Sequence, residues 1–174
     1  MNPPQKVGLT EGIGDSRIFR DLEYAFCLQH IKSGYKVLDV GSSHPWFLLE
    51  LMQRGCSVIT IDIDPNAMRH HKEWGVSCKQ ADLVSLPFDN DSFSLTLCIS
   101  TIEHLHGDND IKGIKEIRRV SPKLILATPV GKATNWNPHN PNMERSYNDR
   151  LLSQRILKGW EVSRRAKIAV WDPN

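Results

Sequence analysis

The chain has 174 residues, of which 40% are hydrophobic and 24% are charged, and its formal net charge is +2. This length suits one domain with one core, and the composition excludes a disordered or fibrous protein. The balanced charge does not favour nucleic-acid binding, and the sequence has no apolar run of the roughly 18 residues that a membrane span requires. We therefore expect a cytoplasmic protein without a membrane segment.

The first predicted element follows an irregular stretch. Residues 1–14 contain prolines and glycines without periodicity, and predict a flexible lead-in to a single domain over residues 15–174. Apolar residues at helical spacing then predict a helix that begins at Asp15 or Ser16 and ends before Gly34.

Strands alternate with helices through the rest of the chain. The predicted strands cover residues 37–40, 57–63, 76–79, 94–100, 123–128, 160–163 and 166–171. The predicted helices cover residues 46–54, 65–74, 108–120 and 145–158, and Asp64 is placed to cap the second of them. Such alternation predicts an α/β fold with a doubly wound, mostly parallel sheet of about seven strands and helices on both faces. The last two strands could close the sheet as an antiparallel hairpin.

Several polar residues fall where the predicted strands end. Asp39 and Gly41 follow the first strand, Asp62 the second, Asp82 the third, and Ser100 with Thr101 the fourth. In an open parallel sheet, ligands bind beyond the carboxyl ends of the strands, where the strand order reverses. A carboxylate at Asp62 is placed to accept hydrogen bonds from the hydroxyl groups of a ribose. An aspartate at a strand end can instead cap the next helix, and this alternative stays open for Asp62.

The turn after the first strand reads GSSHP over residues 41–45, and it contains no G-x-G-x-x-G pattern. The carboxylate of Asp39 would face a pyrophosphate unfavourably, but it would face a cationic ammonium or sulfonium group favourably. A nicotinamide dinucleotide is therefore not the favoured ligand.

Taken together, these motifs resemble the class I S-adenosylmethionine-dependent methyltransferases, in the type 11-like branch that acts on small molecules. VLDVG is similar to the first motif of that family, VITIDIDPNAM to the second, KQADLVSLPFDNDSFSLTLCISTIEHL to the third and fourth, and KLILATP to the fifth strand. The resemblance covers residues 35–129. It implies a Rossmann-like enzyme that uses S-adenosylmethionine to methylate an oxygen, nitrogen or carbon nucleophile of a small molecule.

The resemblance also implies roles for residues on the adenosine side of the cofactor. Asp62 is expected to hold the ribose, and Ile63 is expected to pack on the adenine. Asp82 and the backbone amide of Leu83 are expected to recognise the edge of the adenine.

On the methionine side, the resemblance implies that Asp39 holds the ammonium group and that Gly41 lets the backbone approach the cofactor. Ser100 is expected to line the same region. The family turn usually has further glycines where this chain has Ser42 and Ser43. Because serine replaces glycine easily only at negative φ, we expect a reshaped turn with negative φ at the serines, which still contacts the cofactor.

The acceptor side is predicted from residues near the ends of the pocket. Arg20 and Tyr24 on the first helix are placed to cover the pocket, although the tyrosine could instead be core and the arginine surface. His104 is a candidate general base or substrate contact, and a solvated or capping histidine is the alternative. Trp136 and His139 lie in the loop after the fifth strand, on the usual substrate side.

Two other interpretations were weighed. Glu103, His104 and His106 form a run that could bind a metal ion, but the sequence shows no further ligand at metal spacing, so we predict no metal site.

The alternative function is a non-catalytic module that binds S-adenosylmethionine or a nucleoside as a partner subunit. Because the chain shows no inserted substrate domain, a homodimer contact or the first helix is expected to wall the acceptor site.

Overall fold

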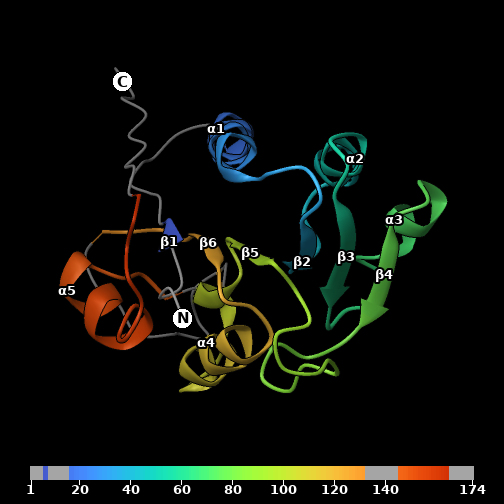
Figure 1. Cartoon of the computed structure of the whole chain (residues 1–174). Helices are drawn as coiled ribbons and strands as arrows, with labels where there is room; N and C mark the ends of the chain where they lie inside the picture. Colours follow the sequence, from blue (N-terminus) through green and yellow to red (C-terminus); the bar gives the residue numbers. More distant parts are fainter. Residues whose placement is uncertain (1–5, 8–15, 132–144, 165–174) are drawn as a thin grey trace.

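The computed structural model describes residues 6–7, 16–131 and 145–164 and places six strands in one sheet (Figure 1). The strands are β1 (Lys6–Val7), β2 (Lys36–Val40), β3 (Ser57–Asp62), β4 (Ser77–Gln80), β5 (Leu95–Ile99) and β6 (Leu124–Ala127). The helices are α1 (Ser16–His30), α2 (Pro45–Gln53), α3 (Arg69–Glu73), α4 (Asn109–Val120) and α5 (Asp149–Leu151), with a 3-10 turn η1 (Ile102–His104) and a π-helical turn η2 (Leu152–Ile156). Within the described ranges, no helix is long and apolar enough to cross a membrane.

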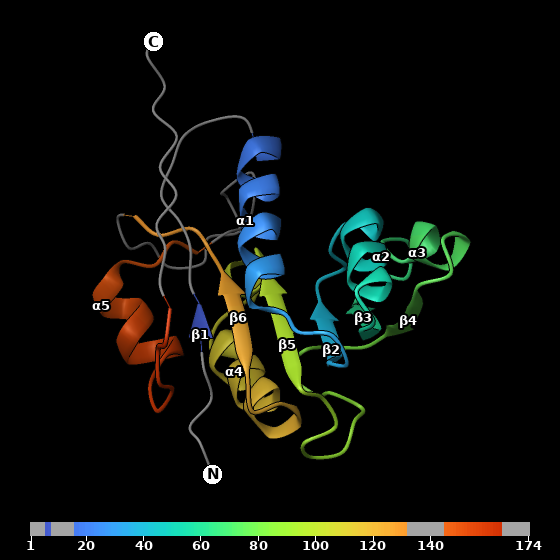
Figure 2. The same cartoon turned by 45° about the horizontal axis from the view of Figure 1, so that its top comes forward.

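Helices cover both faces of the sheet, as the alternation of elements predicts. Figures 1 and 2 show α1 and α2 on one face and α4 on the other. Every residue of β5 is buried, as is typical of a parallel strand with helices on both sides. One core layer joins Phe47 of α2 to Val37 and Leu97, and the opposite layer joins Ile117 of α4 to Leu38. The prediction of a doubly covered parallel sheet is confirmed.

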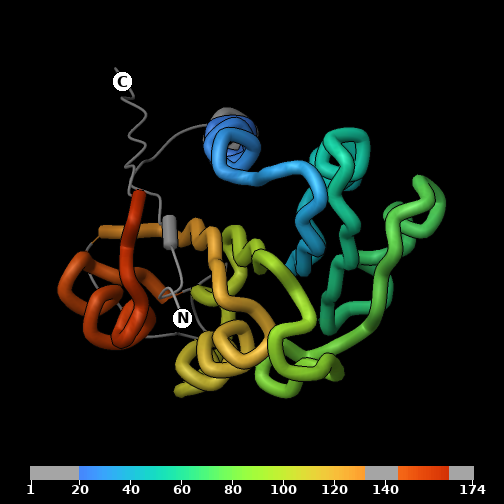
Figure 3. Tube along the Cα trace, viewed as in Figure 1, coloured from blue at the N-terminus to red at the C-terminus, as the bar shows by residue number. Residues whose placement is uncertain are grey.

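The strand order reverses between β2 and β5. The sheet order is β1-β6-β5-β2-β3-β4, and neighbouring strands pair in parallel throughout. The chain therefore runs outward from β2 to β3 and β4, and then returns to place β5 on the other side of β2, a path that Figure 3 traces. The loops after β2 and β5 leave the same end of adjacent strands in different directions. A reversal of this kind opens a crevice for a ligand.

The number and limits of the strands differ from the sequence prediction. The described sheet has six strands rather than about seven. Lys6–Val7, within the predicted lead-in, forms the edge strand β1 by pairing with β6. Over the predicted strand 160–163 the structure assigns only a single bridge residue, Glu161, and the predicted strand 166–171 lies outside the described residues. Short strands such as β1 form only when a distant partner is present, so a local pattern does not reveal them.

The helix after β3 is shorter than the predicted range of residues 65–74. It begins at Arg69 rather than at Pro65, and Asp64 does not cap it. Instead, Asp64 Oδ1 accepts a hydrogen bond from the Asn66 amide at 2.9 Å. This local hydrogen bond holds the residues before α3 in a turn. Aspartate side chains can bind nearby backbone amides in this way, and such bonds compete with the hydrogen bonds of a helix.

The last helical segment also begins later than the predicted residue 145. Tyr147 pairs with Val130 in a parallel bridge, so this part of the chain is extended. The side chain of Asn148 then accepts a hydrogen bond from the Leu151 amide at 2.7 Å and caps α5, which begins at Asp149.

Candidate functional site

The turn after β2 passes very close to the loop after β5. Gly41 has φ +88°, and a Cβ atom built on it would lie 2.2 Å from Thr101 Oγ1. The same Thr101 hydroxyl donates a hydrogen bond to the Val40 carbonyl oxygen at 3.0 Å, which fixes the threonine against β2. Glycine is therefore required here both for its backbone conformation and for the close approach of the two loops.

Ser42 contradicts the expectation of negative φ in this turn, because its φ is +49°. Ser100, in the facing loop after β5, also has a positive φ of +47°. The left-handed conformation costs a residue other than glycine about 1–2 kcal/mol, so neighbouring contacts have to hold it. Our expectation was wrong because it considered the preference of serine itself and not the hydrogen bonds that surround it.

Those hydrogen bonds converge on Ser43 from two sides. Its amide and hydroxyl groups donate to the two carboxylate oxygens of Asp39 at 2.9 and 2.6 Å. On the opposite side, Nε2 of His71 lies 2.6 Å from the Ser43 carbonyl oxygen. Because a carbonyl oxygen can only accept, Nε2 carries the proton and donates it. We call these contacts of Ser43 with Asp39 and His71 the Ser43 clamp.

Asp39 lies behind the turn. Its side chain is fully buried, and it accepts a further hydrogen bond from the Thr60 hydroxyl of β3 at 2.6 Å. Burial raises the pKa of Asp39, and the hydrogen bonds from Ser43 and Thr60 act in the opposite direction. In the structure this carboxylate supports the turn, and its burial behind Ser43 does not agree with the direct contact with an ammonium group that we expected.

A cavity of about 400 Å³ lies at the carboxyl ends of β2, β3 and β5, and we call it the β3 cavity. It brings together the residues predicted for the adenosine side, which are Asp62, Ile63, Asp82 and Leu83. Ile63 is 66% exposed, so a large apolar side chain stands open at the cavity wall. Gly41 and Ser100 also line the β3 cavity.

The two carboxylates of the β3 cavity each hold a local turn. Asp62 Oδ1 accepts from the Asp64 amide at 2.9 Å, and Asp82 Oδ1 accepts from the Val84 amide at 3.0 Å. Asp62 holds this turn but does not cap the next helix, because the N-cap residue of α3 is Met68 and no side chain caps it. A carboxylate has two oxygens, so a turn hydrogen bond to one of them leaves the other available to a ligand.

A second cavity, of about 540 Å³, lies between α1, the turn after β2 and α3, and we call it the α1 cavity. Gly41 and Ser100 line this cavity as well as the β3 cavity, so the two spaces meet at these residues. The α1 cavity also brings together Ser42, Ser43, Arg20 and Tyr24, which the sequence analysis selected, and it includes His70, His71 and Trp74, which it missed.

Tyr24 and Arg20 occupy different environments in the α1 cavity. Tyr24 is 2% exposed, and its ring stacks on Phe47 with centroids 4.1 Å apart. Its hydroxyl oxygen accepts a hydrogen bond from the His44 amide at 2.8 Å. Tyr24 is thus a core residue whose hydroxyl group reaches the turn, whereas Arg20 keeps a side chain that is 38% exposed and pairs with Glu23 at 3.2 Å.

Of the remaining predicted residues, the structure describes only His104, which does not line the α1 cavity. His104 ends η1, is exposed, and lines the β3 cavity. Trp136 and His139 lie outside the described residues. His71 was missed because its contact with the turn joins segments far apart in the sequence, and no local pattern signals it. Thr101 was noted only as a polar residue after the fourth strand, and its contact with Gly41 was not expected.

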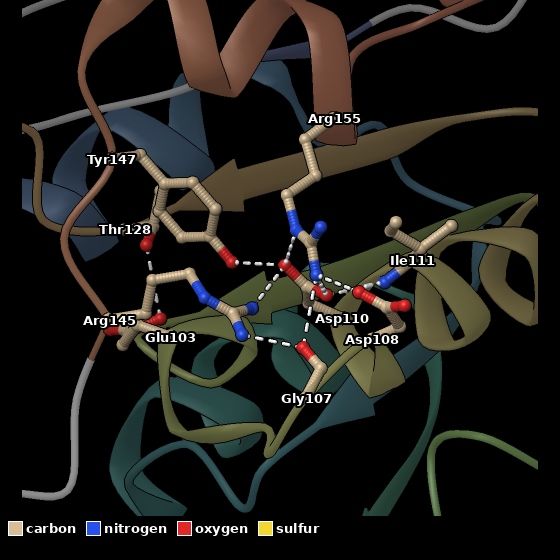
Figure 4. Close-up of polar contacts among 9 residues, drawn as sticks. All are labelled: Glu103, Gly107, Asp108, Asp110, Ile111, Thr128, Arg145, Tyr147 and Arg155. Atoms are coloured by element: carbon tan, nitrogen blue, oxygen red, sulfur yellow. Dashed lines mark hydrogen bonds and ion pairs between the residues drawn. The ribbon is translucent and has the colours of Figure 1, made fainter. Parts of the chain in front are cut away.

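A buried ion-pair cluster lies beside this site (Figure 4). Asp110 of α4 is fully buried and forms ion pairs with Arg145 and Arg155, the latter at 2.6 Å, and it accepts from the Tyr147 hydroxyl at 2.9 Å. Burial alone would raise the pKa of Asp110, but the hydrogen bonds from Arg155 and Tyr147 and the charges of both arginines outweigh it and lower that pKa.

This cluster fixes the loop between η1 and α4. Arg145 and Arg155 both donate to the Gly107 carbonyl oxygen, at 2.5 and 3.0 Å. Leu105 and His106, just before Gly107, line the β3 cavity. Residues from the end of the described chain therefore hold one wall of the cavity, although they do not line it.

The comparisons with known proteins agree with this geometry. Residues 38–123 match the family described as "Methyltransferase domain". An uncharacterized protein of Methanocaldococcus jannaschii is 29% identical over 127 residues, which are 71% of this chain and 53% of that protein. A structure of S-adenosylmethionine-dependent methyltransferases from Methanosarcina mazei matches with a TM-score of 0.50 and 23% identity, over 55% of this chain and 51% of that one.

A third match is the complex of the Trm112 methyltransferase activator with a methyltransferase from Haloferax volcanii. Its TM-score is 0.67 at 16% identity, and it covers 83% of this chain and 69% of that chain. By contrast, the chain spans about half the length of the Methanocaldococcus and Methanosarcina proteins.

The reversal between β2 and β5, with two cavities meeting at the ends of these strands, is typical of a doubly wound, Rossmann-like α/β domain. Together with the family match over residues 38–123, it indicates a class I methyltransferase domain. Members of this class use S-adenosylmethionine as their cofactor. Within the class, residues 38–123 match the methyltransferase type 11 family.

Proposed function

We propose that this protein transfers the methyl group of S-adenosylmethionine to an oxygen, nitrogen or carbon nucleophile of a small molecule. The observation that supports this proposal most is the meeting of the two cavities at Gly41 and Ser100. A cofactor whose adenosine lies in the β3 cavity would extend its methionine end past these residues. The α1 cavity then leaves space for an acceptor beside that end.

The residues of the β3 cavity fit the adenosine part of the cofactor. Ile61, Ala81 and Leu83 give it apolar walls, and the carboxylate of Asp62 supplies a polar group at the strand end. Ligand cavities commonly combine an apolar lining with a few polar groups in this way. We assign Asp62 to the ribose, the exposed Ile63 to the face of the adenine, and Asp82 with the Leu83 amide to its edge.

On the methionine side, the Ser43 clamp would orient the turn of Gly41, Ser42 and Ser43 toward the cofactor. When bound, S-adenosylmethionine supplies a methyl group already activated by the sulfonium centre, so the chain mainly has to align two reactants. We assign Arg20 to the acceptor side, and Tyr24 supports the wall of that space through its hydroxyl contact with the turn. His104 is the candidate base for an acceptor proton, and its position on the β3 cavity requires the acceptor to reach past Ser100.

The first experiment is calorimetric titration with S-adenosylhomocysteine, followed by a search for turnover with a panel of small phenols, amines and carbon acids. We expect micromolar to submillimolar binding and release of S-adenosylhomocysteine with at least one acceptor class. Absence of binding at millimolar ligand would remove the proposed cofactor site and with it the proposed reaction.

A second candidate function is a methyltransferase subunit whose turnover requires an activator protein. One observation favours it: the similar Haloferax volcanii chain was solved together with a methyltransferase activator. Binding of S-adenosylhomocysteine without turnover by the isolated chain, with turnover restored by a partner from the native cell extract, would support this alternative over the first.

A further inference from the structure

We propose that the α1 cavity binds a carboxylate group of the acceptor through the guanidinium group of Arg20. This inference rests on the proposed methyl transfer and adds the chemical class of the acceptor, a small acid with an apolar body. Four observations support it: the charge of the cavity, the donors of Arg20, the state of Glu23 and the apolar lining.

The cavity has a one-sided set of charged and titratable side chains. Its lining includes Arg20 and three histidines, His44, His70 and His71, and among the described residues no aspartate or glutamate lines it. The carboxylate of Asp39 is sealed behind Ser43, where it is fully buried. A small ligand in this cavity therefore meets cationic or neutral groups, a lining that favours an anion over a cation.

Arg20 has N–H donors that its pair with Glu23 does not use and that could bind such an anion. Its Nη1 pairs with Glu23 Oε2 at 3.2 Å, and its guanidinium carbon lies 5.9 Å from the centre of the Tyr24 ring. A guanidinium group has five N–H donors in a planar fork that matches a carboxylate. The Arg20 side chain is 38% exposed while that of Glu23 is nearly buried, and Arg20 lines the α1 cavity, so its remaining donors are accessible to a ligand there.

The competing carboxylate of Glu23 is weakened as a partner near neutral pH. Burial raises the pKa of Glu23 to about 7, although the charge of Arg20 lowers it in part. A sizeable share of Glu23 is therefore protonated at pH 7. A protonated Glu23 gives the Arg20 guanidinium group no negative charge to pair with. An incoming carboxylate would supply one.

The cavity also offers apolar surface beside the arginine. Trp74 is 53% exposed, and together with Pro45, Ala67 and Ile99 it lines the same space. A large aromatic side chain that stays this exposed at the wall of a cavity gives a flat ligand a surface to pack on. An acid with an aromatic or branched apolar body fits this combination better than a sugar or a polyamine.

The same carboxylate chemistry could come from the methionine end of the cofactor itself, and the experiment separates the two sources. The protein is saturated with S-adenosylhomocysteine and titrated, by ligand-observed NMR, with benzoate and 3-phenylpropanoate and with their neutral amides. Separately, the affinities for S-adenosylhomocysteine and for 5′-methylthioadenosine, which lacks the carboxylate, are measured by calorimetry. The variants are Arg20→Gln and the control Arg54→Gln, which breaks an exposed pair with Glu50 away from both cavities.

We expect the acids to bind at least tenfold more tightly than their amides, as a charge-assisted pair predicts. Arg20→Gln should abolish this preference while leaving the affinity for S-adenosylhomocysteine within threefold, and Arg54→Gln should change neither. Thermal unfolding of both variants establishes that they fold.

Equal binding of acids and amides, no binding of any probe, or a preference that survives in Arg20→Gln would overturn the inference. It is also overturned if Arg20→Gln weakens S-adenosylhomocysteine tenfold and spares 5′-methylthioadenosine, because the arginine then serves the cofactor. Failure of the wild-type protein to bind S-adenosylhomocysteine would instead remove the proposed function, and the inference with it.

Discussion

Gly41→Ala is the sharpest test of the contact between the two loops at the site. The new Cβ would lie 2.2 Å from Thr101 Oγ1 and 2.9 Å from Thr101 Cγ2, and the backbone is held at φ +88°. The left-handed conformation costs about 1–2 kcal/mol for alanine, and overpacking of this kind costs about 1–3 kcal/mol more. We therefore expect a loss of about 2–5 kcal/mol in the free energy of unfolding.

Gly75→Ala is the matched control, because Gly75 has a similar φ of +74° and nothing lies within 4 Å of its added Cβ. It should cost only the backbone term of about 1–2 kcal/mol. Urea unfolding measures both variants, and calorimetry measures the affinity for S-adenosylhomocysteine. Gly41→Ala should also lower that affinity at least tenfold, since the shifted turn lines both cavities, whereas Gly75→Ala should leave it unchanged.

A second background removes the Thr101 side-chain atoms that clash with the new Cβ. Thr101→Ala deletes both clashing atoms and leaves Thr101 Cβ, which would lie 3.1 Å from the new methyl group. In that background Gly41→Ala should cost about as much as Gly75→Ala does. Equal losses for Gly41→Ala and Gly75→Ala in the wild-type background would refute the reasoning, because steric contact with Thr101 would then contribute nothing.

Three further outcomes follow from the same structure. Asp62→Ala should weaken S-adenosylhomocysteine binding at least tenfold in calorimetry, while the exposed neighbour Asp64→Ala changes it less than threefold; equal effects would remove Asp62 from the ribose site. His71→Phe should weaken S-adenosylhomocysteine at least threefold and spare 5′-methylthioadenosine, since the Ser43 clamp supports only the methionine side; an equal loss of both ligands would argue against this role. Because burial raises the pKa of Glu23 from 4.5 to about 7, the folded state keeps a proton that the unfolded state releases, so stability falls as pH rises through this window. Glu23→Gln should reduce this fall, seen in urea unfolding at pH 5 and pH 8, by up to about 3 kcal/mol, and unchanged pH dependence would contradict the assigned burial.

Much of the fold can be read from local patterns. The central strands, α2 and α4 are found within a residue or two of their predicted limits, and α1 ends three residues earlier than predicted. These elements are readable because buried strands require apolar runs and amphipathic helices require a regular apolar face. The last helix was predicted to begin at residue 145, but α5 begins at Asp149. The extended conformation of Tyr147 depends on a bridge to Val130, which lies far away in the sequence.

The sequence by itself determined which residues stand at the ends of the strands, since strand ends follow from hydrophobic runs and turn residues. It therefore identified Gly41, Asp62 and Ser100, which the structure places at the cavities. Only the tertiary structure decided how the turn is held. Ser42 takes a left-handed conformation, and His71 reaches the Ser43 carbonyl oxygen from another helix. Such contacts depend on distances between segments that the fold brings together, and local preferences of single residues do not contain that information.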